Sequence, residues 1–126
     1  MDEQELTALL EQWEGVYKKG LLTFWVLLLL YEHPMYVFEM GQALESVSKG
    51  TMTADERSLY RALHRFEWVG FVESEWQDSE VGPQRRYYRL SELGRELLRR
   101  FARRNILLFQ EPEVAARLTR LMDDEN

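Results

Sequence analysis

The chain has 126 residues and a mass of 15.1 kDa, a size typical of a single domain with one hydrophobic core. Apolar residues make up 45% of the sequence, which excludes an intrinsically disordered chain, and the absence of cysteine excludes disulfides, thiolate metal sites and thiol redox chemistry. The net charge of −6 argues at first against nucleic acid as a partner.

This charge is unevenly distributed along the chain. Residues 1–49 carry three basic and eight acidic residues, residues 50–104 carry eleven and nine, and residues 105–126 carry two and five. All eleven basic residues of the middle segment are arginines, whose forked guanidinium group suits phosphate and guanine recognition. A nucleic-acid footprint in the middle segment is therefore compatible with an acidic chain.

Two helices are predicted before Pro34. Apolar residues at helical spacing, with acidic residues between them, indicate an amphipathic first helix that ends near Gly15. These residues are Leu6, Leu9, Leu10, Trp13 and Tyr17. A second helix is predicted from about Lys18 to Tyr31, because the residue before a proline is disfavoured in a helix.

The most apolar stretch of the chain runs from Leu21 to Leu30. It is about half as long as the roughly 20 residues that a transmembrane helix needs, so no membrane span or membrane partner is expected. We expect it to be buried in a core or an oligomer interface. Residues 1–14 are acidic and carry no basic leader, which together with the short apolar run predicts a cytoplasmic protein.

A helix, a short turn and another helix are predicted next. Tyr36–Val47 forms the first of these, with Val37, Met40, Leu44 and Val47 on one side, and the turn follows at Gly50. Either Thr53 or Asp55 caps the following helix, which ends at Gly70. The core side of that helix carries Leu59, Ala62, Leu63 and Phe66.

The pattern after Gly70 changes to extended. Strands are predicted at 71–76 and 86–90, joined by a long tip at 77–84, so this segment forms a β-hairpin. Ser91 then caps a helix that runs towards Phe109, and Pro112 starts a last, weaker helix that ends in an acidic tail. The first of these helices carries Leu93, Leu97, Leu98, Phe101 and Leu108.

This order of elements predicts a mainly α fold of the winged helix-turn-helix type with a two-stranded β-wing. Three regions are expected: an N-terminal dimerisation helix at 1–17, a DNA-binding domain at 18–90, and a C-terminal dimerisation helix with the acidic tail at 91–126. Fold alone does not establish function, so the chemistry of the helix before the hairpin decides it.

The outer face of that helix carries donors that suit phosphates and base edges. The residues are Arg57, Ser58, Arg61, His64 and Arg65, with Tyr60 at the flank. The hairpin adds Gln84, Arg85 and Arg86 beside a Gly-Pro turn, where a wing reaches the DNA backbone or minor groove. The alternative for the helix is a solvated face held in ion pairs.

Five ordered segments resemble the PadR family of bacterial transcriptional regulators. They lie within residues 19–99 and read KGLL at 19–22, PMYVFEM at 34–40, LYRALHRFE at 59–67, GFVESEW at 70–76 and RRYYRLSELGR at 85–95. The last four are similar to the family patterns PMYGYEI, LYRALKRLE, GLIESEW and RRKYYRLTEEGR. Two departures stand out: Val37 and Phe38 replace Gly-Tyr, and Arg57 replaces a small residue.

The resemblance implies a homodimeric repressor that binds double-stranded DNA at a palindromic operator. It also implies that the C-terminal helix packs against the N-terminal region of the partner. The apolar stripes of the two terminal helices independently require a covering surface, and a symmetric dimer is the commonest solution. The alternative function is a winged-helix protein-interaction module that has lost DNA binding, which the net charge and Arg57 favour.

No catalytic, metal or cofactor site is predicted. His33 and His64 are 31 positions apart without a ligand-spaced partner, and neither a phosphate-binding loop nor a nucleophile arrangement is present. His33 is expected in a turn, and we expect no enzyme activity. Aromatic residues on the dimer helices, Trp13 and Phe101, are candidates for binding a small aromatic effector, with packing as the alternative.

Overall fold

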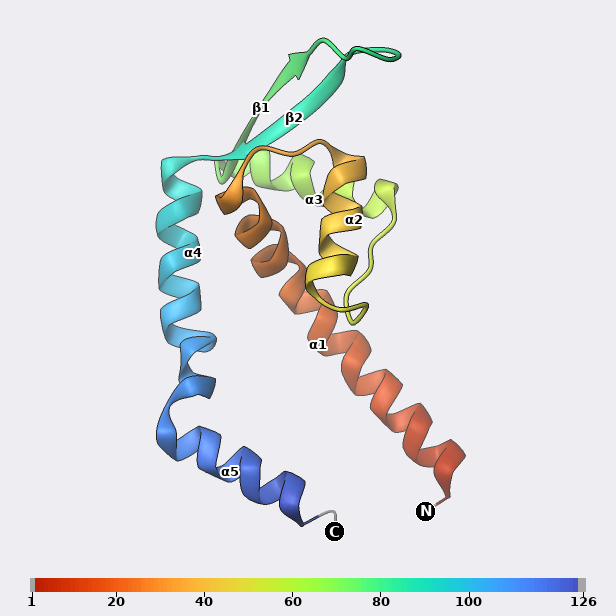
Figure 1. Cartoon of the computed structure of the whole chain (residues 1–126), viewed down its shortest axis with the longest axis vertical. Coiled ribbons are helices and arrows are strands. Elements are labelled where there is room, and N and C mark those ends of the chain that lie inside the picture. The colour runs from red at the N-terminus through yellow and green to blue at the C-terminus, as the bar shows by residue number, and fades with distance from the viewer. Residues whose placement is uncertain (1, 125–126) are drawn as a thin grey trace.

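Helices dominate residues 2–124, which the computed structural model describes, and one two-stranded antiparallel sheet accompanies them (Figure 1). The elements are α1 (Glu3–Glu32), α2 (Val37–Val47), α3 (Glu56–Val69), β1 (Val72–Gln77), β2 (Arg85–Leu90), α4 (Glu92–Asn105), the 3-10 helix η1 (Leu107–Gln110) and α5 (Pro112–Asp123). The predicted mainly α, winged architecture is confirmed.

A single helix, α1, replaces the two helices predicted before Pro34, so the predicted end near Gly15 was wrong. A glycine inside a helix costs only about 1 kcal/mol, and the chain has no proline between Asp2, which caps the helix, and His33, which ends it. Lys18 and Glu14, 3.4 Å apart, form an ion pair beside the glycine. The N-terminal half of α1 consequently projects away from α2 and α3 (Figure 1).

The hydrophobic core lies where the C-terminal half of α1 meets α2, α3 and the base of the sheet. Its fully buried side chains include Val26, Leu29, Met40, Leu44, Leu59, Leu63 and Val72. The predicted core stripe of α3 is buried throughout, whereas Val47, predicted on the core side of α2, is 49% exposed. Val47 is the last residue of α2, beyond the part of the helix that the core covers.

The helix-turn-helix consists of α2, a short turn and α3. The turn uses two left-handed residues, Lys49 at φ 56° and Gly50 at φ 79°, and the buried Ser48 Oγ accepts a hydrogen bond from the Met52 N–H at 2.9 Å. Asp55 caps α3, its Oδ1 accepting from the Ser58 N–H at 2.7 Å. Gly70, at φ 91°, ends the helix as predicted.

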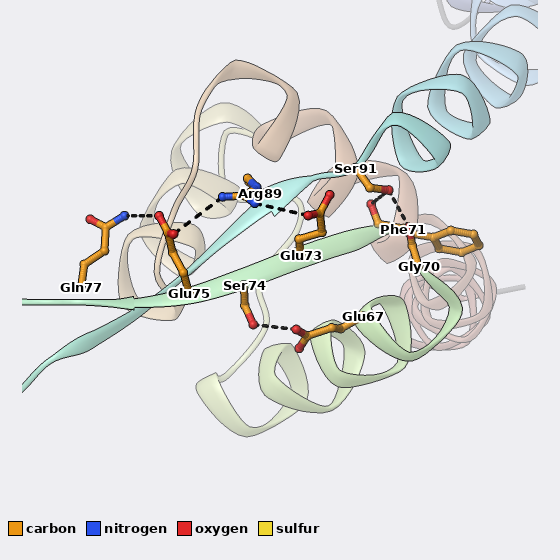
Figure 2. A network of polar contacts seen from close by, with 9 residues as sticks. All are labelled: Glu67, Gly70, Phe71, Glu73, Ser74, Glu75, Gln77, Arg89 and Ser91. Carbon is orange, nitrogen blue, oxygen red and sulfur yellow. Dashed lines mark hydrogen bonds and ion pairs between the residues drawn. The ribbon is translucent and has the colours of Figure 1, made fainter.

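The wing is the β1–β2 hairpin, paired from Val72↔Leu90 to Gln77↔Arg85. A bridge between Met35 and Tyr88 fastens β2 to the segment that connects α1 with α2. At the base of the wing, Ser91 caps α4 and its hydroxyl donates to the backbone carbonyls of Gly70 and Phe71 (Figure 2).

The C-terminal helix ends earlier than predicted. α4 stops at Asn105, whose side chain donates to the Phe101 carbonyl at 3.1 Å and so competes with the helical backbone. Leu108 and Phe109 therefore lie in η1. α5 begins at Pro112 as predicted, while Glu125 of the predicted acidic tail lies outside the described residues. Within 2–124 no helix is both long and apolar enough to cross a membrane.

Candidate nucleic-acid interface

The outer face of α3 is exposed. Arg57, Arg61, His64 and Arg65 lie on the surface, Ser58 is half-buried, and Tyr60 is 49% exposed. Within residues 2–124 no carboxylate lies within 4.0 Å of the guanidinium groups of Arg57, Arg61 or Arg65, so the predicted alternative of an ion-paired face is not what the structure contains. All three arginines are exposed, and the Arg65 guanidinium lies 6.0 Å from the centroid of the Phe66 ring.

The first turn of α3 combines a cap with positive charge. The Ser58 N–H donates to Asp55 Oδ1 at 2.7 Å, and this bond, with the nearby Ser58 hydroxyl and the charges of Arg61 and Arg57, lowers the pKa of the Asp55 carboxyl below the ordinary 3.8. The carboxylate is thus used within the helix N-terminus. The side chains of the next two turns remain free to meet an external anion.

The wing presents Arg85 and Gln84 differently. The Arg85 guanidinium lies over the Tyr36 ring, 4.5 Å from the ring centroid. Arg85 itself pairs with Gln77 at the end of the sheet. Gln84 donates from Nε2 to Asp78 Oδ1 at 2.8 Å and braces the tip. Arg85 thereby packs on the segment between α1 and α2 and still offers charge at the start of β2.

Arg86 does not extend from the wing tip. Its Nη2 lies 2.9 Å from Oε1 of Glu67 at the end of α3, and its Nε donates to Ser74 Oγ at 3.0 Å. Ser74 in turn donates to Glu67 (Figure 2). Side chains alternate across a strand, so Arg85 and Arg86 face opposite sides of β2, and the structure turns Arg86 towards α3.

Two lysines that the sequence reasoning did not assign lie near the α3 face. Lys18 and Lys19 of α1 line the same groove as Ser58, Arg61 and Arg65. The sequence does place Lys18 and Lys19 on the same helical face as Gly15, because they follow it by three and four residues. It does not indicate which side of α1 faces α3.

The structure does not bring Trp13 and Phe101 together. Trp13 is 74% exposed and lines an apolar groove of about 420 Å³ with Tyr17, Trp25 and Met52. Phe101 packs on Phe24, with ring centroids 5.6 Å apart, beside a separate hollow of about 100 Å³. Within one chain they belong to two different surfaces.

The histidines take the places expected from the sequence. His33 ends α1, and its Nδ1 lies 2.9 Å from the Pro34 carbonyl oxygen, while His64 lies on the exposed face of α3. Across the described part of the chain no three histidine or acidic side chains gather as metal ligands would.

Comparison with known proteins places this architecture in a family. Residues 26–100 match the transcriptional regulator PadR-like family. A PadR family regulator of Eggerthella lenta superposes with a TM-score of 0.65 at 23% identity, covering 96% of this chain and 92% of that one. A PadR-like regulator of Bacillus cereus superposes with a TM-score of 0.63 at 25% identity, covering 82% of this chain and 93% of that one.

Two further proteins are similar to this chain. Bacillus subtilis PadR in complex with operator DNA gives a TM-score of 0.60 at 16% identity, over 64% of this chain and 45% of that one. An uncharacterized protein of Lysinibacillus sphaericus is 29% identical over 80 residues, which are 64% of this chain and 73% of that protein. Because the family match spans more than half of its residues, the chain belongs to the PadR-like family of transcriptional regulators.

Proposed function

We propose that this protein is a bacterial, cytoplasmic regulator that binds DNA sequence-specifically as a homodimer and acts as a repressor at a palindromic operator. The observation that carries the proposal is the α3 face, where Arg57, Arg61 and Arg65 are exposed without ion-pair partners in the described chain. Arginine is the residue that most often reads guanine in the major groove. The relative from Bacillus subtilis, solved with operator DNA, supports the same use of the fold.

The roles within the interface follow from position. Arg61 and His64, on the outward side of α3, are proposed to meet base edges, with Arg57 on the same side at the start of the helix and Ser58 and Arg65 on one flank. Tyr60, Gln84 and Arg85 are proposed to contact the phosphate backbone or minor groove. Arg86 acts indirectly, by holding the wing against α3.

The homodimer is supported by apolar side chains that one chain leaves exposed. On α1, Leu6, Leu9 and Leu10 are each about half exposed, and Trp13 more so. On the C-terminal elements the exposed apolar residues include Leu93, Leu97, Leu107, Leu108, Phe109, Leu118 and Leu121. Contact between α1 of one protomer and α4, η1 and α5 of the other would cover both sets, and the resulting two-fold axis accounts for a palindromic site.

The dimer is tested with a matched pair on α1. Leu6 and Ala8 lie on roughly opposite sides of the helix at about 100° per residue. Leu6→Glu is expected to dissociate the dimer on sizing with light scattering, and Ala8→Glu to leave it intact. Equal masses for the two variants and the wild type would remove α1 from the interface.

DNA binding is tested by selecting bound fragments from a bacterial genome. The expected result is an enriched inverted repeat whose affinity exceeds that of random DNA by about a thousandfold or more. Repression is then read from a reporter placed behind that site. Weak, salt-sensitive binding with no enriched repeat would instead favour a protein-interaction module, for which the net charge of −6 speaks.

A small aromatic effector is proposed to bind at the Trp13 groove, which is apolar and about 420 Å³ in volume. Phe101 contributes only if the partner protomer brings its α4 to this groove. A flat hydrophobic compound that favours one dimer arrangement would shift operator occupancy. Titration with an aromatic panel should quench tryptophan fluorescence and weaken operator binding, and Trp13→Ala should reduce both effects. Unchanged fluorescence and affinity would return Trp13 to a packing role.

A further inference from the structure

We propose that Lys19 of α1, supported by Lys18, contacts a DNA phosphate strand on the side of α3 opposite to the wing. The inference rests on the proposed DNA-binding function and extends its footprint to an element outside the helix-turn-helix and wing. A groove of about 1130 Å³ lies between the middle of α1, the α2–α3 turn and α3.

One face of α1 forms a wall of this groove. The α1 residues that line the groove are Gly15, Lys18, Lys19, Leu22 and Thr23. The last four follow Gly15 by three, four, seven and eight residues, which is the spacing of one helical face. α3 contributes Ser58, Arg61 and Arg65 to the opposite wall. The groove thus joins two lysines to part of the predicted reading face.

The charge of the groove suits a polyanion. Four basic side chains line it, and the one acidic lining residue, Asp55, is engaged as the cap of α3. Lys18 is paired with Glu14 at 3.4 Å. Lys19 is exposed and has no carboxylate within 4.0 Å in the described part of the chain, so it is the more available cation.

The two flanks of α3 explain why this anion is a DNA strand. At about 100° per residue, Ser58 and Arg65 lie on one flank of the helix, Glu67 on the other, and Arg61 between them. Glu67 faces the wing through Ser74 and Arg86. A helix in the major groove has a phosphate strand on each side, so the wing serves one strand and α1 is placed at the other.

The same helix keeps this contact apart from the dimer surface. Leu6 and Trp13 lie roughly opposite to Gly15 and Lys19 around α1, so DNA and the partner protomer do not compete. Glu11 lies one turn before Gly15 on the groove side. Its carboxylate would repel the DNA phosphates, so the proposed DNA contact does not extend along α1 beyond this residue.

The test uses two matched pairs of variants and the fragment recovered by the genomic selection. Lys19→Gln should lower affinity for specific and random DNA alike and reduce the slope of log K against log salt by about one, and Lys19→Arg should retain the slope. Gly15→Glu should weaken binding about tenfold relative to Gly15→Gln. Its thermal midpoint should not fall below that of the wild type, because glycine is a poor helix former.

Each result decides the proposal. A Lys19→Gln slope equal to that of the wild type, together with equal affinities for Gly15→Glu and Gly15→Gln, would overturn it while leaving DNA binding by α3 intact. The proposal is also wrong if the wild type and Lys19→Gln have the same slope of log K against log salt while sodium tripolyphosphate stabilises the wild type but not Lys19→Gln. In that case the groove binds a small polyanion. Absence of DNA binding by the wild type would overturn the proposed function itself.

Discussion

Arg86 of the wing donates a hydrogen bond to Glu67 at the end of α3, with Nη2 2.9 Å from Oε1. Ser74 closes the contact, because its hydroxyl donates to Glu67 Oε2 at 2.6 Å and accepts from Arg86 Nε at 3.0 Å. The guanidinium also lies near the rings of Trp76 and Tyr88, 5.8 and 5.5 Å from their centroids. α3, β1 and β2 are therefore held at one relative orientation.

The first prediction concerns this contact. Arg86→Ala should lower the free energy of unfolding by about 1 kcal/mol, a modest value because both side chains are partly exposed. It should weaken operator binding without changing the salt slope, because the guanidinium is engaged inside the protein. Urea unfolding and salt titrations measure the two effects. A slope that flattens would place Arg86 on the DNA instead.

The second prediction separates base reading from phosphate contact. Arg61→Ala should relax base preference in the operator by about 1 to 3 kcal/mol, because Arg61 lies on the outward side of α3. Arg85→Ala should weaken binding to all sequences and reduce the salt slope by about one. Affinities for the operator and a set of single-base variants provide the measurement. Exchanged outcomes would mean that helix and wing have each other's roles.

The third prediction concerns Gly94 in the first turns of α4. A Cβ at this position would collide with the Phe71 carbonyl oxygen and lie 2.8 Å from Leu90 Cδ1. Gly94→Ala should therefore destabilise the fold by about 2 to 4 kcal/mol in urea unfolding. Gly20→Ala, with nothing within 4 Å of its added Cβ, is the control and should stabilise by about 0.5 to 1 kcal/mol. Similar values for the two variants would contradict the close packing of α4 on the base of the wing.

The fourth prediction concerns pH. Hydrogen bonds from Ser58 and the charges of Arg61 and Arg57 lower the pKa of Asp55 below 3.8 in the folded protein. Its contribution to stability is therefore present above the ordinary pKa and lost as the pH falls through the folded value. Asp55→Asn keeps a capping oxygen but cannot titrate. Urea unfolding should show a loss below about pH 4 in the wild type that is smaller in Asp55→Asn. Identical pH profiles would exclude this contribution.

Local sequence determined α3 and its face. Asp55 and Gly70 mark the two ends of the helix, and the buried stripe between them fixes which side faces outward. The continuity of α1 was not predictable in this way. Gly15 lowers the helix propensity at one position only, whereas the residues that favour a helix extend along the whole of α1.

The different orientations of Arg85 and Arg86 depend on tertiary structure. Adjacent strand residues face opposite sides, but which of the two faces α3 is set by the register of β2 on β1 and by Glu67, which is distant in sequence. The place of Lys19 likewise depends on how α1 crosses α3. Spacing within one element identifies a face, and only packing identifies what that face meets.

Because α1 is one continuous helix, a small change of angle where it leaves the core produces a large displacement of its N-terminal end. Thirty residues at 1.5 Å each give a rod of about 45 Å, with its inner end fixed among the buried side chains Val26, Leu29 and Leu30. A tilt of about 5° at the inner end moves the outer end by about 4 Å over this length. If two protomers join at their outer ends, the distance between their reading helices is therefore set by the angle at which each rod leaves its core.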